Sequence, residues 1–310
     1  MSQLDLNTLS NKPVAYFSNK NPAACIGLTM TFYFGAPGEP GKRQALVKCI
    51  NHYLQQAKGQ LQFYAVAGDK RHRTLKPGEN PNPDLLAKMQ DTDITLDFEA
   101  GGADEGVANP WSIGSLARGV TNPHYMGYLL LSYPASMLNQ MGVQGFSKQF
   151  VAICNALHVE HAYAGLGLII PFDVAGSRAA HGVLGEAAMQ WPGLDAYNLT
   201  TTSIHCRHGI KSINFLTAIS HRIQSKAGGT EAILANAGSQ VLSCPYSNGT
   251  VFQAGHEPQI GAPNQPPEDY VALGRALKAA RAPFEDSMFD DPAGQDDEAF
   301  TQRWLARFDG

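Results

Sequence analysis

Apolar and polar positions recur along this chain with two periods, and each period predicts a different kind of element. Residues 25–34 alternate with a period of two, which is typical of a strand with one apolar face. Between Leu46 and Ala57 the apolar positions recur every three to four residues, which predicts a helix with a single apolar stripe. Gly59 follows where a left-handed helix cap favours glycine. The chain therefore begins as strand, helix and strand.

The rest of the upstream half repeats these patterns. A turn at Thr121-Asn122-Pro123 separates two of the expected strands, and the polar stretch Lys70–Pro83 is expected to be a loop. Further strands are expected at 60–67, 94–98, 111–120, 125–133 and 161–171. Helices are expected at 84–90, 146–157, 177–190 and 270–277, with a closing helix whose Phe300, Trp304, Leu305 and Phe308 share one face. That aromatic face predicts a tail that docks on the body of the protein.

The segment from Trp191 to Gly261 is the one around which the remainder is expected to pack. It opens with a sharp turn, Trp191-Pro192-Gly193-Leu194-Asp195. An apolar helix is predicted from Gly209 to Thr217, running on to a stop at Gly228-Gly229. A strand pair is predicted next, at 240–243 and 250–253. The order of elements predicts an α+β fold, with a mixed, mainly antiparallel sheet, packed helices and a helical C-terminal tail. We expect a single domain over residues 1–310, with a subdivision into the halves 1–172 and 173–310 as the alternative.

Composition narrows the class of protein. The 310 residues are 44% apolar and 16% charged, which is typical of a folded domain and excludes a disordered chain. The formal net charge is −4, which disfavours direct nucleic-acid binding, and the one basic run, Lys70-Arg71-His72-Arg73, is expected to be solvated loop. No apolar run is long enough to span a bilayer, and the N-terminal residues do not resemble a secretory signal. Five scattered cysteines favour free thiols in a reducing compartment. We expect a cytoplasmic protein without a membrane segment.

The motifs of common catalytic sites are missing from the sequence. There is no nucleophile elbow, no phosphate-binding glycine loop and no pair of cysteines or histidines at zinc-ligand spacing. His205-Cys206-Arg207-His208 is the one metal-like group, and it is interpreted as packing at the start of the predicted 209–223 helix. We therefore predict no catalytic residues, no metal and no cofactor. An enzyme that uses Asp97, Glu99 and His256 as a hydrolase site remains the alternative from another class, and a scaffold protein that binds an unrelated partner remains a third.

A run of carboxylates near the C-terminus is the feature with the most evident potential for a partner. Between Glu285 and Glu298 the sequence contains no Lys or Arg. Such a run is often a solvated linker, but it also suits the basic cleft of a nucleic-acid enzyme, because complementary charge speeds association and selects the partner. The predicted partner-binding residues are Asp286, Asp290, Asp291, Asp296, Asp297 and Glu298.

Several motifs resemble one known family in their order along the chain. The turn at Trp191–Asp195 is similar to its (Y/W)-P-G-L-D signature, and Gly209–Thr217 resembles G-(I/V)-(K/R)-x-(V/I)-N-W-L-T, with Phe215 in place of the usual Trp. Gly228-Gly229, Val251–Gly255 and Arg303–Phe308 follow in the expected order. These motifs cover about the last 120 residues. They resemble the type VI secretion immunity family that accompanies VRR-type nuclease effectors.

This resemblance implies a non-catalytic antidote that protects the producing cell and its siblings by binding one cognate toxin. The implied partner is a nuclease effector protein of the restriction-endonuclease-like class, with a DNase as the expected activity. Two mechanisms follow from it: the acidic surface plugs the nuclease cleft, or the antidote binds elsewhere and blocks effector assembly or DNA access.

Overall fold

The computed structural model describes residues 6–9, 12–76, 79, 81–103, 106–119 and 125–310. The strands are β1 (Pro13–Tyr16), β2 (Pro22–Phe34), β3 (Phe63–Val66), β4 (Arg73–Thr74), β5 (Leu96–Gly101), β6 (Ser112–Ala117), β7 (Gly127–Pro134), β8 (His161–Ile169), β9 (Leu216–Ser220), β10 (Val241–Tyr246) and β11 (Gly249–Ala254). The helices are α1 (Leu6–Leu9), α2 (Pro40–Gln56), α3 (Asn82–Met89), α4 (Met137–Leu157), α5 (Val174–His181), α6 (Gly185–Gln190), α7 (Leu199–His205), α8 (His221–Gln224), α9 (Gly229–Ala237), α10 (Glu268–Ala276) and α11 (Asp297–Leu305).

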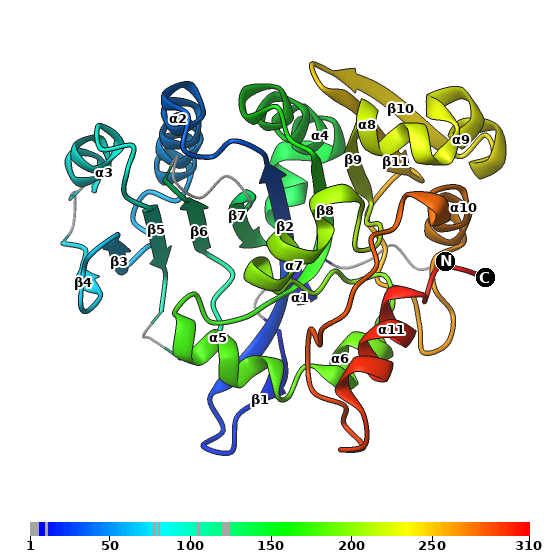
Figure 1. Ribbon diagram of the computed structural model, residues 1–310. Helices are drawn as coiled ribbons and strands as arrows, with labels where there is room; N and C mark the ends of the chain where they lie inside the picture. The colour runs from blue at the N-terminus through cyan, green and yellow to red at the C-terminus, as the bar shows by residue number, and fades with distance from the viewer. Residues whose placement is uncertain (1–5, 10–11, 77–78, 80, 104–105, 120–124) are drawn as a thin grey trace.

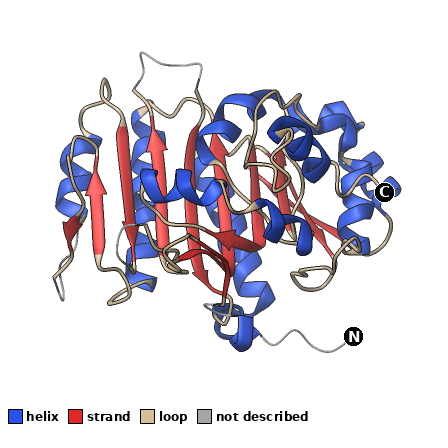
Figure 2. Ribbon diagram, turned by 90° about the horizontal axis from the view of Figure 1, so that it is seen from below, coloured by secondary structure: helices blue, strands red, loops and turns tan. Residues whose placement is uncertain are grey.

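One sheet runs through the whole molecule in the order β10-β11-β9-β8-β2-β7-β6-β5-β3-β4, with β1 beside β2. Its named strands pair antiparallel, and helices lie on both sides of it (Figures 1 and 2). Parallel pairing within the described ranges is limited to isolated bridges such as Gly167 with Asp195. The predicted α+β fold with a C-terminal helix is confirmed. Strands from both halves of the chain share this sheet, and the single-domain assignment stays a prediction.

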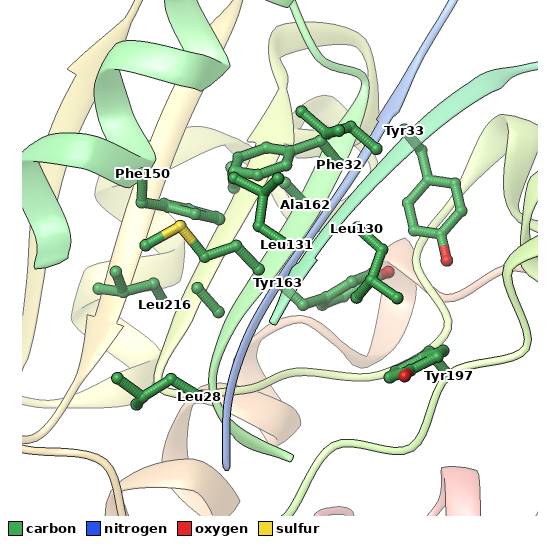
Figure 3. Packing of buried hydrophobic residues seen from close by; sticks show 14 of the residues in the cluster. Leu28, Phe32, Tyr33, Leu130, Leu131, Phe150, Ala162, Tyr163, Tyr197 and Leu216 are labelled. Atoms are coloured by element: carbon green, nitrogen blue, oxygen red, sulfur yellow. The ribbon is translucent and has the colours of Figure 1, made fainter. Parts of the chain in front are cut away.

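The central strand β2 has a different environment on each face because successive side chains alternate across a sheet. Leu28, Met30 and Phe32 point toward α4, where the Phe32 and Phe150 rings lie 5.2 Å apart. Figure 3 shows Leu28 and Phe32 in one apolar layer with Leu131, Phe150 and Leu216. Burial of this layer supplies the hydrophobic stabilisation that holds α2 and α4 on the sheet.

The opposite face of the sheet is made of small and polar side chains. On β2 it carries Thr29, Thr31 and Tyr33, all buried. The strand register places Tyr163 of β8 and Ser132 of β7 beside them. Helices α5 and α7, with the irregular stretches 191–198 and 209–215 on either side of α7, cover this face. It is the face on which buried polar groups need partners, and the candidate sites lie there.

The prediction of a helix from Gly209 to Thr217 is wrong. Residues 211–215 are irregular, and the chain enters β9 at Leu216. The Phe215 N–H donates to the Asn214 side-chain oxygen at 2.7 Å, and the Asn214 N–H donates to Thr217 Oγ1 at 3.0 Å. Such local side-chain bonds replace those that a helix would make. The predicted helix at 177–190 is also interrupted, because α5 ends at His181 and α6 begins at Gly185.

Most other predicted elements are present with shifted ends. The strand pair extends to 241–246 and 249–254, and Gly228 adopts φ 84° between two helices, as a left-handed cap requires. The loop at 70–83 contains the short strand β4 and the start of α3. The predicted turn at Thr121-Asn122-Pro123 lies outside the described residues. Phe300, Trp304, Leu305 and Phe308 are all buried, so the prediction of a docked tail is confirmed.

Candidate functional site

The resemblance motifs meet in a buried ion pair beneath the polar face of the sheet. Lys211 Nζ lies 2.6 Å from Asp195 Oδ1, and the two side chains are 0% and 1% exposed. Nζ also donates to the Ala196 carbonyl at 2.8 Å, and the Lys211 backbone N–H donates to the Tyr163 hydroxyl at 2.9 Å. Burial lowers the pKa of Lys211, and the adjacent Asp195 charge opposes that shift. A buried pair with these extra hydrogen bonds fixes two distant segments in one register.

Arg307 joins the C-terminal tail to the same cluster. Its Nε donates to the Pro192 carbonyl at 2.7 Å, and its guanidinium lies 3.7 Å from the Trp304 ring centroid. Burial lowers the pKa of Arg307 to about 9, with Asp195 opposing. The turn at 191–195, the segment around Lys211 and the tail therefore form one internal unit.

Two glycines permit this close packing. A Cβ on Gly165 of β8 would lie 2.4 Å from the Asn214 side-chain oxygen, and one on Gly193 would lie 2.3 Å from the Gln259 carbonyl. The Gly193 N–H donates to the Ile260 carbonyl at 2.9 Å, so the turn contacts the chain that leaves β11. Any larger residue at either position would push the segments apart.

The acidic segment, residues 285–298, lies on the surface before and at the start of α11. Phe284, Met288 and Phe289 are buried and anchor it, while Phe289 packs 5.3 Å from the Trp304 ring. Between and after these anchors six carboxylates are exposed: Glu285, Asp286, Asp290, Asp296, Asp297 and Glu298. The segment is thus a folded surface that presents carboxylates, and not a loose linker.

Three of the predicted contact residues also have a role inside this segment. Asp291 is 8% exposed and accepts from the backbone N–H groups of Ala293, Gln295 and Asp296. These bonds lower the pKa of Asp291. Asp296 caps α11 through the Ala299 N–H at 2.9 Å, and Asp297 accepts from the Asp291 N–H at 2.7 Å. The carboxylates of Asp286, Asp290 and Glu298 project from the surface, with Asp286 3.7 Å from His205. The partner-binding role of all six residues stays a prediction.

The structure does not bring the proposed hydrolase residues together. Asp97 and Glu99 lie on β5, whereas His256 is exposed in the bend after β11. Five strands separate β5 from β11, which corresponds to about 30 Å at the usual strand spacing. Glu99 instead contacts His72, at 2.6 Å. The three residues cannot act on one substrate atom in this arrangement.

The remaining chemical candidates have local partners. Cys206 is buried. Its neighbour His205 ends α7, and His208 lies in the turn of 3₁₀ helix that follows. The helix predicted to start at residue 209 does not form. No group of three or more His, Cys, Asp or Glu in the described part of the chain has the geometry to hold a metal ion. In the basic run, Arg73 pairs with Asp69 at 2.6 Å and with Asp84 at 2.7 Å.

Comparison with known proteins decides the family. Residues 45–308 match the TsiV family, described as type VI immunity for VRR-NUC. The chain belongs to the TsiV family. No curated protein matches it. A solved Pseudomonas aeruginosa T6SS protein, PA0821, has the same fold with a TM-score of 0.81 and 23% sequence identity, over 98% of this chain and 88% of that one. The prediction of a type VI immunity protein for a VRR-type nuclease effector is confirmed, and the TsiV chain has an effector as its partner.

The motifs that indicate the TsiV family lie inside the protein. Three of their residues are no more than 1% exposed: Asp195, Asn214 and Trp304. The Lys211 side chain is 0% exposed. They therefore hold the fold, and the contacts that select an effector have to come from other, exposed residues. Among the described residues no helix has both the length and the apolar character required to cross a membrane.

Sequence reasoning missed the pairing of Asp195 with Lys211. The signal was present, since an aspartate and a lysine each stood in an otherwise apolar motif. A charged residue within an apolar run indicates a buried partner, but the sequence does not say which one.

Proposed function

We propose that this TsiV-family chain neutralises its effector by binding the nuclease directly, one to one, with the acidic segment against the cationic surface that holds DNA. A nuclease contacts phosphates mainly through Lys and Arg side chains, so its substrate cleft is a positively charged surface. The six exposed carboxylates between Glu285 and Glu298, with no basic residue among them, carry this proposal.

The anchoring of the segment supports a role in tight binding. Its carboxylates stand on a backbone that Phe284, Met288 and Phe289 fix in place, so little conformational entropy is lost on association. We further infer that the chain acts without catalysis, that it does not itself contact DNA, and that the effector is a DNase met in the cytoplasm. The separation of Asp97 and Glu99 from His256 supports the non-catalytic role.

Co-expression with the protein encoded by the adjacent gene, as the candidate VRR-NUC effector, tests the proposal. We expect a stable one-to-one complex and loss of DNA cleavage at stoichiometric inhibitor. If the candidate effector is not toxic when expressed alone and forms no complex with this chain, the proposed function is refuted. A tight complex in which the effector still binds DNA would instead place the contact away from the cleft.

Removing the projecting carboxylates should slow association. We expect the triple variant Asp286→Asn, Asp290→Asn, Glu298→Gln to lower the association rate constant about tenfold at low salt, with a smaller effect at high salt. These three positions avoid Asp291 and Asp296, whose carboxylates organise the segment.

A matched control removes the same number of charges elsewhere. Glu39, Glu231 and Glu257 are exposed and lie outside the acidic segment. Their triple Gln variant should associate at close to the wild-type rate when both are measured by surface plasmon resonance. Equal rates for the two triple variants at low salt would remove the acidic segment from the interface.

A further inference from the structure

A cleft of about 440 Å³ opens on the polar face of the sheet, between β5, β6 and β7 on one side and α5 and α7 on the other. This volume is within the range of about 300–1,000 Å³ usual for ligand sites. The strand register explains its floor, because Asp97, Glu99, Gly114 and Tyr128 lie on one face of the sheet, and they line the cleft together with residues of α7. Gly114 lacks a side chain and leaves the space open.

Polar groups of the chain point into this cleft without filling it. Ser112 is 2% exposed, lines the cleft, and its hydroxyl has no hydrogen-bond partner among the described residues. Asp97 borders the same space, and no described side chain forms an ion pair with its carboxylate. Asp97 itself is exposed at the mouth of the cleft. A buried hydroxyl inside the cleft and a carboxylate at its mouth, both without such partners, indicate a site for a polar, cationic group.

The rim has the character of a protein-binding surface. Val174, at the start of α5, lines the cleft and is 78% exposed, which makes it the most exposed large apolar side chain described. At the other end of α5, His181 also lines the cleft, and its carbonyl accepts the Asp290 N–H at 3.2 Å. The helix α5 thus joins the cleft to the acidic segment (Figure 1).

We propose that this cleft receives an arginine side chain of the effector, with the Asp97 carboxylate as its partner, so that the cleft and the acidic segment form one interface. This inference rests on the proposed function, because it takes the nuclease as the occupant. A guanidinium forms paired hydrogen bonds with a carboxylate, and a recessed site of this kind with an apolar rim is the usual form of an interface hot spot. A DNA-binding surface supplies exposed arginines.

The charges around Asp97 agree with a cationic occupant. Asp97 is exposed at the mouth of the cleft, yet the chain packed around it desolvates the carboxylate. This desolvation, then the Glu99 charge, raises the pKa of Asp97 to about 7, while Arg118 and the Phe98 N–H oppose the shift. The other charged or titratable groups that line the cleft are Glu99 on β5, Tyr128 on β7, Arg178 and His181 on α5, and Tyr197. His72 contacts Glu99 from beside the cleft. Burial lowers the pKa of His181, and no ion pair joins Arg178 to Asp97 within the described ranges.

The pH dependence follows from the sign of this shift. A bound guanidinium favours the ionised carboxylate and lowers its pKa, so binding releases a proton near neutral pH. Affinity should rise roughly tenfold from pH 6 to pH 8 as Asp97 ionises in the free protein. The variant Asp97→Asn should lose this part of the pH dependence.

Two variants test the cleft, with the effector complex measured by calorimetry. Asp97→Asn keeps the shape and removes the charge. Gly114→Leu fills the space and keeps the charge; a Cβ at Gly114 meets only Leu199, at an ordinary 3.8 Å, so the backbone there accepts a side chain that extends into the cleft. We expect each to weaken the complex tenfold or more, whereas the exposed control Glu257→Gln binds like the wild type.

Stability measurements separate binding from folding. Because the folded-state pKa of Asp97 is raised from 3.8 to about 7, stability falls as the pH rises through this range and the full loss is present at pH 8. Asp97→Asn should therefore be at least as stable as the wild type at pH 8. Wild-type affinity in Asp97→Asn, or in a folded Gly114→Leu protein, would overturn the inference while leaving the proposed function intact. If Gly114→Leu does not fold, Asp97→Asn alone decides. Absence of any wild-type complex would instead refute the proposed function.

Discussion

Replacing Lys211 with alanine is expected to lower the free energy of unfolding by about 3–5 kcal/mol, because it leaves the buried Asp195 carboxylate without its ion-pair partner. The Asp195 side chain is 1% exposed, and its Oδ2 atom already has no hydrogen-bond partner among the described residues. Without Lys211 the carboxylate would lose its ion-pair partner. The Arg307 charge acts on Asp195 but its guanidinium hydrogen-bonds the Pro192 and Leu194 carbonyls, so it does not replace that pair. The segment that covers the polar face of the sheet would then lose its attachment.

Urea denaturation followed by circular dichroism measures this effect. The exposed control Lys148→Ala should change the free energy of unfolding by no more than about 0.5 kcal/mol. The double variant Asp195→Asn, Lys211→Met should recover much of the loss, because it removes both buried charges. A loss of less than 1 kcal/mol in Lys211→Ala, as an order-of-magnitude threshold, would show that the pair does not hold the fold.

Truncation of Trp304 to alanine is expected to have an effect of similar size, about 3–5 kcal/mol. Trp304 is fully buried and lies between the acidic segment and the central cluster. Its ring contacts Phe289 on one side and the Arg307 guanidinium, 3.7 Å from its centroid, on the other. A cavity here would loosen both the tail and the backbone that carries the projecting carboxylates. Inhibition of the effector should therefore weaken together with stability.

Trp304→Phe provides the matched comparison. The indole N–H has no acceptor among the residues that the structure describes, so phenylalanine removes an unpaired donor and keeps most of the apolar contact. We expect its loss of unfolding free energy to be less than half that of Trp304→Ala in the same urea titration. Equal losses in the two variants would mean that the polar edge of the indole, and not its packing, stabilises the tail.

Local patterns in the sequence predicted the elements that depend on local physics. The alternation in 25–34 and the helical stripe of 46–57 correspond to β2 and α2, because the spacing of apolar positions is written directly into the chain. The tertiary structure buries both faces of β2, which the alternation did not indicate. The helix prediction for residues 209–217 failed for the opposite reason. Its apolar residues meet partners from β8 and the tail, and Asn214 and Thr217 satisfy backbone groups that a helix would have used.

The sequence by itself determined the family, the α+β class and the presence of an acidic segment, since ordered motifs and charge runs are properties of the chain. Only the tertiary structure decided that Asp195 meets Lys211, that Asp291 and Asp296 organise the acidic segment, and that His256 lies far from Asp97. The cleft beside Asp97 likewise exists only where β5 and β6 meet α5 and α7. Strand order and long-range packing create these neighbours, and residues that are remote in sequence carry no local signal of each other.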